Sequence, residues 1–155
     1  AGFGMVEIIL ALALAAMFFL AIYEMILFSN KIIASNLRQT EALHFAQEGL
    51  EAVRVIRDNG WTANITQLLN DTDYYLSLSG NQWTLTTTAE PALNGIFTRT
   101  IIFSAVTRDG NGDIVASGGA IDPKTRRVSA TVSWTERGYD QNVELQTYIT
   151  NLLNN

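Results

Sequence analysis

Residues 5–28 read MVEIILALALAAMFFLAIYEMILF, and this stretch decides the fold of the chain. It contains no proline or glycine, and its only charged side chains are Glu7 and Glu24. Alanine, leucine and methionine favour helix, and a helix of this length rises roughly 36 Å. Such a helix is long enough to cross the hydrocarbon core of a bilayer. We therefore predict one continuous helix that is apolar on all sides.

The composition of the 155-residue chain limits the functions that it can have. Hydrophobic residues make up 48% and charged residues 16%, and residues 1–28 hold most of the apolar excess. Because the net charge is −5, we expect no direct binding of nucleic acid, which needs a basic footprint. The absence of cysteine excludes thiolate metal sites. With His44 as the single histidine, we expect no enzyme and no cofactor.

The helix is predicted to continue beyond residue 28. Six apolar residues recur at a broadly helical spacing and would form one stripe along the helix: Ile33, Leu37, Leu43, Ala46, Leu50 and Val53. The sequence Asp58-Asn59-Gly60 is typical of a helix end. The first half, residues 1–30, must be covered by lipid or by other copies, which would bury on the order of 1,500 Å². The second half, residues 31–58, should pack on a sheet of the same chain.

The spacing of apolar residues changes to two after residue 80, which predicts β-strands. Four stretches show this pattern: residues 82–88, 97–107, 127–134 and 142–149. We interpret residues 59–80 as a connecting region, with Trp61 as an anchor in the core. Gly49 predicts a close approach of another backbone, or a bend. The predicted fold is α+β: a long N-terminal helix packed on an antiparallel sheet of three to five strands, within a globular region of residues 31–155.

The first residues, Ala1-Gly2-Phe3-Gly4-Met5-Val6-Glu7, resemble the processing motif of type IV prepilins. The resemblance implies that a prepilin peptidase cuts after Gly2 and that Phe3 is then N-methylated. It also implies that Glu7 pairs with the N-terminus of a neighbouring subunit during assembly. Either Phe3 or Ala1 can be the first mature residue, and only Phe3 places Glu7 at the fifth position, as in the family. The helix-breaking proline or glycine common in the family's apolar segment is absent here.

Residues 46–61, AQEGLEAVRVIRDNGW, are similar to a segment of pilin-like proteins from episymbiotic candidate-phylum bacteria, and residues 97–155 resemble the same group. The resemblance implies a structural subunit of a type IV pilus, which is a homopolymeric filament used for adhesion or twitching motility. It further implies an inner-membrane location before assembly and a cell-surface location afterwards. The implied partners are other copies of the chain, the prepilin peptidase, the assembly platform and a host cell surface.

Glu24 is a second carboxylate within the apolar segment. It either reaches the membrane interface or pairs with Lys31 or Arg38 of a neighbouring subunit, so we assign Phe3, Glu7 and Glu24 to filament assembly. Two other functions remain open from the sequence. One is a pseudopilin of a type II secretion or DNA-uptake apparatus, and the other is a membrane-anchored binding domain.

Asp109, Asn111 and Asp113 occupy positions one, three and five of a calcium-loop pattern. Position six is Ile114 instead of the required glycine, so a hairpin turn is the preferred interpretation, and calcium binding stays open. Residues 124–127 contain three basic side chains, which we interpret as a solvated surface patch or a contact between subunits.

Overall fold

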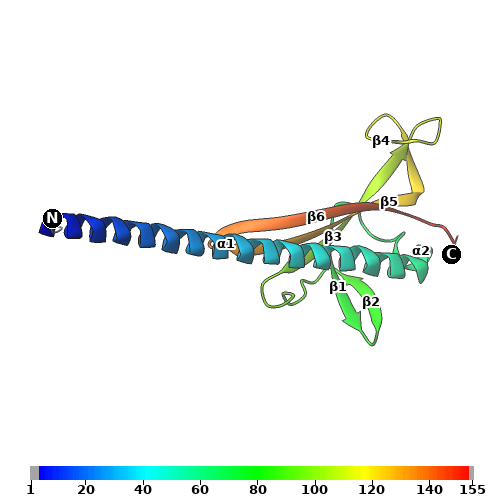
Figure 1. Cartoon of the computed structure of the whole chain (residues 1–155). Helices are drawn as coiled ribbons and strands as arrows, with labels where there is room; N and C mark the ends of the chain where they lie inside the picture. Colours follow the sequence, from blue (N-terminus) through cyan, green and yellow to red (C-terminus); the bar gives the residue numbers. More distant parts are fainter. Residues whose placement is uncertain (1–3, 154–155) are drawn as a thin grey trace. The chain divides into compact units, whose positions relative to one another are not determined.

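The long N-terminal helix forms as the sequence predicts. In the computed structural model, which describes residues 4–153, α1 runs without a break from Met5 to Asp58 (Figure 1). The amide of Asn59 donates to the carbonyl of Val55 at 3.0 Å, and Gly60 follows with φ of 138°. That backbone conformation favours glycine, so the chain leaves the helix at the predicted place.

The chain divides into two compact units, Ala1–Gln39 and Thr40–Asn155. In the first, Ile33 and Leu37 are 53% and 65% exposed, although both belong to the predicted packing stripe. That prediction was wrong for these two residues, because the helix has a sheet to pack against only in the second unit. The positions of α1 that are buried there are Ala42, Ala46, Gly49, Leu50, Ala52, Val53 and Ile56.

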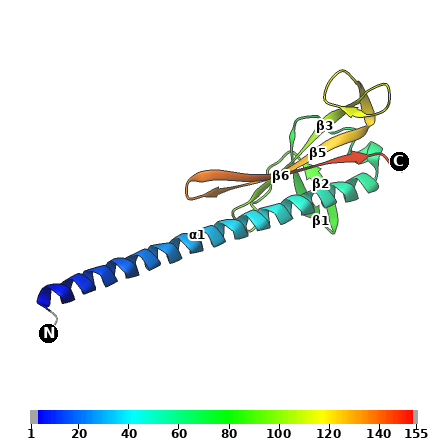
Figure 2. The ribbon, with the colours of Figure 1, turned by 45° about the horizontal axis from the view of Figure 1, so that its top comes forward.

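Six antiparallel strands follow the helix, and the α+β architecture is confirmed. They are β1 (Asp73–Ser79), β2 (Gln82–Thr86), β3 (Thr98–Arg108), β4 (Ile114–Val115), β5 (Ala120–Glu136) and β6 (Tyr139–Thr150). Their order is β2-β1-β3-β5-β6, with β4 paired to β3. The sheet thus exceeds the expected three to five strands. In Figure 2, β5 and β6 form a long hairpin, and Trp134, Thr135 and Glu136 of β5 pair with β6 alone.

The interpretation of residues 59–80 as a plain connection was wrong. This region contains the short helix α2 (Trp61–Asn64) and all of β1. Tyr74 and Leu76 of β1 are buried, and Ser79 pairs with Gln82 across a two-residue turn. Both turn residues, Gly80 and Asn81, have positive φ (55° and 67°), as tight hairpins require.

The core lies between residues 42–56 of α1 and the face of the sheet that they cover. Its aromatic side chains are in contact, with ring centroids 5.6 Å apart for Phe97 and Trp134 and 5.9 Å apart for Tyr74 and Phe103. Ile101 and Val128 are fully buried in the same core cluster. Trp61 is buried in the same cluster, which confirms it as the anchor at the end of α1.

Candidate functional site

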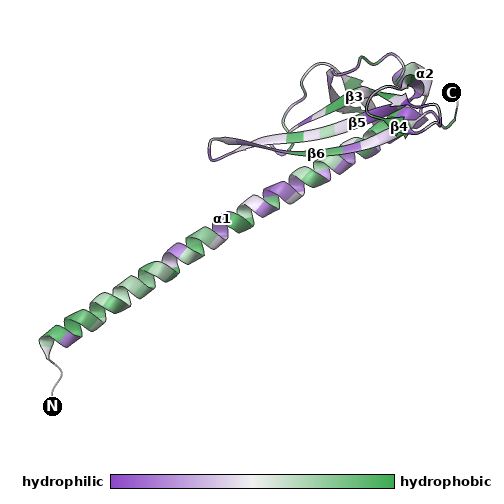
Figure 3. Cartoon of the chain, turned by 90° about the horizontal axis from the view of Figure 1, so that it is seen from above, coloured by the Kyte–Doolittle hydropathy of each residue, from purple (hydrophilic) through white to green (hydrophobic). Residues whose placement is uncertain are grey.

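The first half of α1 is a surface without any cover from its own unit. Every residue from Gly4 to Ala34 is exposed, including the large side chains of Phe18, Phe19 and Phe28. In Figure 3 this half is almost uniformly hydrophobic, whereas the later half alternates with polar residues. Among residues 4–153, α1 is the one helix long and apolar enough to cross a membrane, and none of its apolar window is buried. This half of the helix is the candidate functional site.

Glu7 has a partner within its own chain. It is the third residue of α1, and its Oε2 accepts a hydrogen bond of 2.7 Å from the amide of Gly4, which immediately precedes the helix. This is the half of a capping box in which the glutamate reaches back to the N-cap amide. The carboxylate also lies at the positive end of the helix dipole. Its Oε1 forms no hydrogen bond within residues 4–153.

Of the other residues predicted to act in processing and assembly, the structure describes only Glu24. Glu24 is exposed and forms neither a hydrogen bond nor an ion pair within the described part of the chain. Gly2 and Phe3, the predicted processing and methylation positions, lie outside the described residues. The structure therefore places Glu7 and Glu24 on one helix about 25 Å apart along its axis, and it does not bring them together.

Gly49 marks a close approach, as predicted, but side chains and not another backbone come near it. A β-carbon at this position would lie 3.0 Å from Cδ of Arg99 and 3.2 Å from Cδ1 of Ile101. Arg99 is only 7% exposed; it donates to the carbonyl of Phe45 at 3.0 Å and lies over the ring of Trp83. Burial lowers the pKa of its guanidinium, and the carboxylate of Glu48, 3.5 Å away, opposes this shift.

Arg99 was not predicted from the sequence, because an arginine in an alternating strand is normally expected on the solvent face. The available signal was its position, since Arg99 has the same parity as the buried residues of β3, Ile101 and Phe103. Its role in the described structure is to fill the space that Gly49 leaves open.

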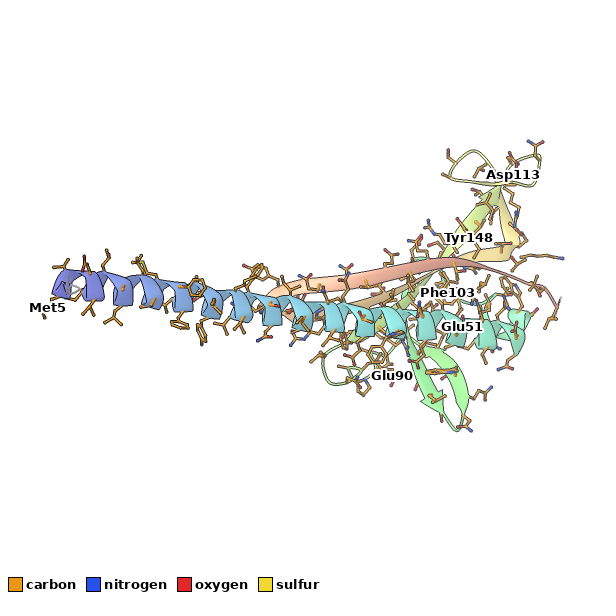
Figure 4. The ribbon with its side chains drawn as sticks, viewed as in Figure 1. Met5, Glu51, Glu90, Phe103, Asp113 and Tyr148 are labelled. Atoms are coloured by element: carbon orange, nitrogen blue, oxygen red, sulfur yellow. The ribbon has the colours of Figure 1, made fainter. Side chains whose placement is uncertain are left out.

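The segment Asp109–Asp113 forms a hairpin turn between β3 and β4, as preferred from the sequence (Figure 4). Oδ1 of Asp109 accepts the amides of Asn111 and Asp113, both at 2.9 Å. Within residues 4–153 there is no group of three or more His, Cys, Asp or Glu side chains able to hold a metal ion. Beside this turn, a hydrogen bond from Arg108 lowers the pKa of Asp122, whose Oδ2 lies 2.7 Å from Arg108 Nε.

The basic side chains of residues 124–127 do not form one solvated patch. Arg126 is half-buried and donates to the carbonyl of Leu68 at 3.1 Å and to the side chain of Asn70. It thereby fastens the segment between α2 and β1 to β5. Arg127 is exposed on the opposite face of β5.

A cavity of about 240 Å³ lies beside the end of α1, with Trp83 and Leu85 of β2 on one side. Its polar lining consists of Asn59, Asn64, Gln67, Gln82 and Thr84. None of these side chains titrates near neutral pH, so the cavity offers no group for acid–base catalysis.

Comparison of the chain with protein-family models, with curated proteins and with solved structures finds no significant match.

Proposed function

We propose that this chain is a structural subunit of a type IV pilus-like filament that assembles through the first half of α1. The observation that carries the proposal is that this half is apolar and exposed on every side, while the second unit, Thr40–Asn155, has a core of its own; we call this unit the head. A helix with this surface cannot remain in water, because burial of apolar area is the main favourable term in association. Lipid covers it in the inner membrane before assembly, and other copies cover it in the extracellular filament.

The two oxygens of Glu7 support a dual role in this process. Oε2 caps the chain's own helix through Gly4, and Oε1 is left to accept a hydrogen bond or ion pair from the amino end of a neighbour. An unpaired carboxylate among apolar helices is costly, about 2.5–3.5 kcal/mol at mid-membrane. The cost favours assembly in which each Glu7 meets a positive charge of the next copy.

Electron microscopy of sheared surface material, with antibody labelling of this chain, tests the proposal. Long filaments that contain the chain support it, and a short, cell-bound polymer favours the pseudopilin. A chain found in no polymer, but active in detergent as a binding protein, would contradict it.

Two substitutions of Glu7 separate its roles. Glu7→Gln keeps an oxygen for the Gly4 amide but removes the charge, whereas Glu7→Ala removes both. We expect both variants to insert in the membrane and neither to form filaments, as measured by fractionation and filament yield. Normal filaments from Glu7→Gln would show that Glu7 acts only as a helix cap.

A further inference from the structure

Glu24 and Lys31 are the only charged side chains between residues 8 and 33. Both are exposed, and within residues 4–153 neither forms a hydrogen bond or an ion pair. They lie seven residues apart, which is close to two helical turns, so they share one side of α1 with a separation of about 10.5 Å along the axis. Side chains pair within a helix at spacings of three or four, so these two charges do not satisfy each other.

Two parallel copies of α1 displaced by seven residues bring these charges together. Glu24 of one copy is then level with Lys31 of the next, and the apolar side chains of Met17, Ala21 and Phe28 on the same side pack against the neighbouring helix. Because each copy offers Glu24 to one neighbour and Lys31 to the other, the contact is heterologous and continues without closing. Arg38 is a poorer partner for Glu24, since it already makes an interaction within its own chain.

We propose that an ion pair between Glu24 of one copy and Lys31 of the next fixes a seven-residue parallel stagger of α1 in the polymer. This inference rests on the proposed filament function and adds the register of its subunits.

The membrane-inserted monomer does not need this pair. Glu24 lies about 28 Å along the helix from Met5, close to the far boundary of a hydrocarbon core about 30 Å thick. Both charges can then reach water on their own. Charge reversals at these positions should thus change assembly while leaving membrane insertion as it was.

Charge reversal in the full-length chain tests the pair. We expect Glu24→Lys and Lys31→Glu each to reduce filament yield about tenfold or more, the factor that 1.4 kcal/mol of lost interaction gives. The double variant should recover most of the wild-type yield. Lys31→Arg, which keeps the positive charge at the same position, is the matched control and should assemble normally.

Cysteine cross-linking tests the stagger and its direction, and the natural absence of cysteine leaves no background. Ala21→Cys with Phe28→Cys should give a ladder of disulfide-linked multimers on oxidation of the filaments. Ala21→Cys with Ala34→Cys should give no cross-link, because those positions meet only when Glu24 and Lys31 pair between antiparallel helices. That isologous contact would give disulfide-linked dimers and no ladder.

The outcomes separate this inference from the filament proposal. Normal filaments from either single charge reversal, failure of the double variant to recover, or disulfide-linked dimers from the second cysteine pair alone would overturn the stagger while leaving the filament intact. A wild-type chain that forms no polymer would overturn the filament proposal and the stagger with it.

Discussion

Gly49 shows how one residue sets the distance between α1 and the sheet. Arg99 passes directly beneath it and is held by the carbonyl of Phe45 and by Trp83. Because its guanidinium is held by both of these contacts, the side chain has little freedom to move away from a new atom. Gly49 therefore lets a buried arginine cross the helix surface.

Gly49→Ala should lower the free energy of unfolding of the head by about 1 kcal/mol. Alanine gains up to about 1 kcal/mol in helix propensity, but its β-carbon would lie 3.0 Å from Arg99 Cδ and 3.2 Å from Ile101 Cδ1. Overpacking of this kind costs about 1–3 kcal/mol. Thermal unfolding of the full chain in detergent, followed by near-ultraviolet circular dichroism, measures the change.

The matched control is Gly110→Ala, because a β-carbon at Gly110 meets nothing within 4 Å. We expect its melting temperature to equal that of the wild type. A Gly49→Ala variant that melts at or above the wild-type temperature would show that Arg99 moves freely and that helix propensity dominates.

At the scale of elements, the sequence predicts α1 and the strands with long alternating patterns. It does not predict a strand, or the end of a strand, that depends on pairing with a neighbouring strand. β1 was missed because the seven residues of DYYLSLS follow a polar stretch, although Tyr74 and Leu76 do alternate inward. β5 begins at Ala120, earlier than residue 127, and contains Pro123. This proline is tolerated because the pairing of β5 with β6 starts only at Thr125, and a sequence alone does not show where a partner strand ends.

The candidate site was easier to predict than the sheet. The apolar half of α1 depends on composition and on the helical rise, and both can be read from residues 5–28. The capping role of Glu7 was within reach as well, since its position in the first turn favours a carboxylate. What the sequence could not provide was the end of the uncovered surface. Ile33 and Leu37 continue the apolar spacing, but the packing of α1 begins only at Ala42.

Calcium should not change the stability of the β3–β4 turn. Oδ1 of Asp109 already accepts two backbone amides, and the turn is further closed by a hydrogen bond of 3.0 Å from the Asp109 amide to the carbonyl of Asp113. We expect equal melting temperatures in excess EDTA and in millimolar calcium. Asp109→Ala should destabilise the head by about 1 kcal/mol, since it leaves two amides without their acceptor.

Asp113→Ala is the control for the turn, because the Asp113 carboxylate forms no hydrogen bond within residues 4–153. It should melt with the wild type. A rise in melting temperature with calcium that Asp113→Ala abolishes would instead establish a metal site in this loop.

At the scale of the whole molecule, one helix serves two environments. Residues 4–39 have no buried position, whereas residues 42–56 supply one side of a closed core. The head is therefore stabilised by contacts within Thr40–Asn155, and the first half of α1 takes no part in these contacts. In the filament that we propose, such a division would let the helix leave the membrane and enter a polymer without unfolding the head.

Removal of residues 1–28 should leave a soluble, monomeric protein that unfolds cooperatively. The deletion removes the continuous run of exposed apolar side chains from Met5 to Phe28 and none of the buried side chains of α1. A deletion of residues 1–48 is the matched comparison: it also removes Ala42 and Ala46, which are fully buried, together with Phe45, whose carbonyl accepts from Arg99. Gel filtration and thermal circular dichroism should show a folded monomer for the first variant and a loss of cooperative melting for the second. Aggregation of the first variant, or its failure to fold, would mean that folding of the head depends on the first half of α1. The proposed exchange of lipid for the α1 helices of neighbouring copies could then not take place while the head stays folded.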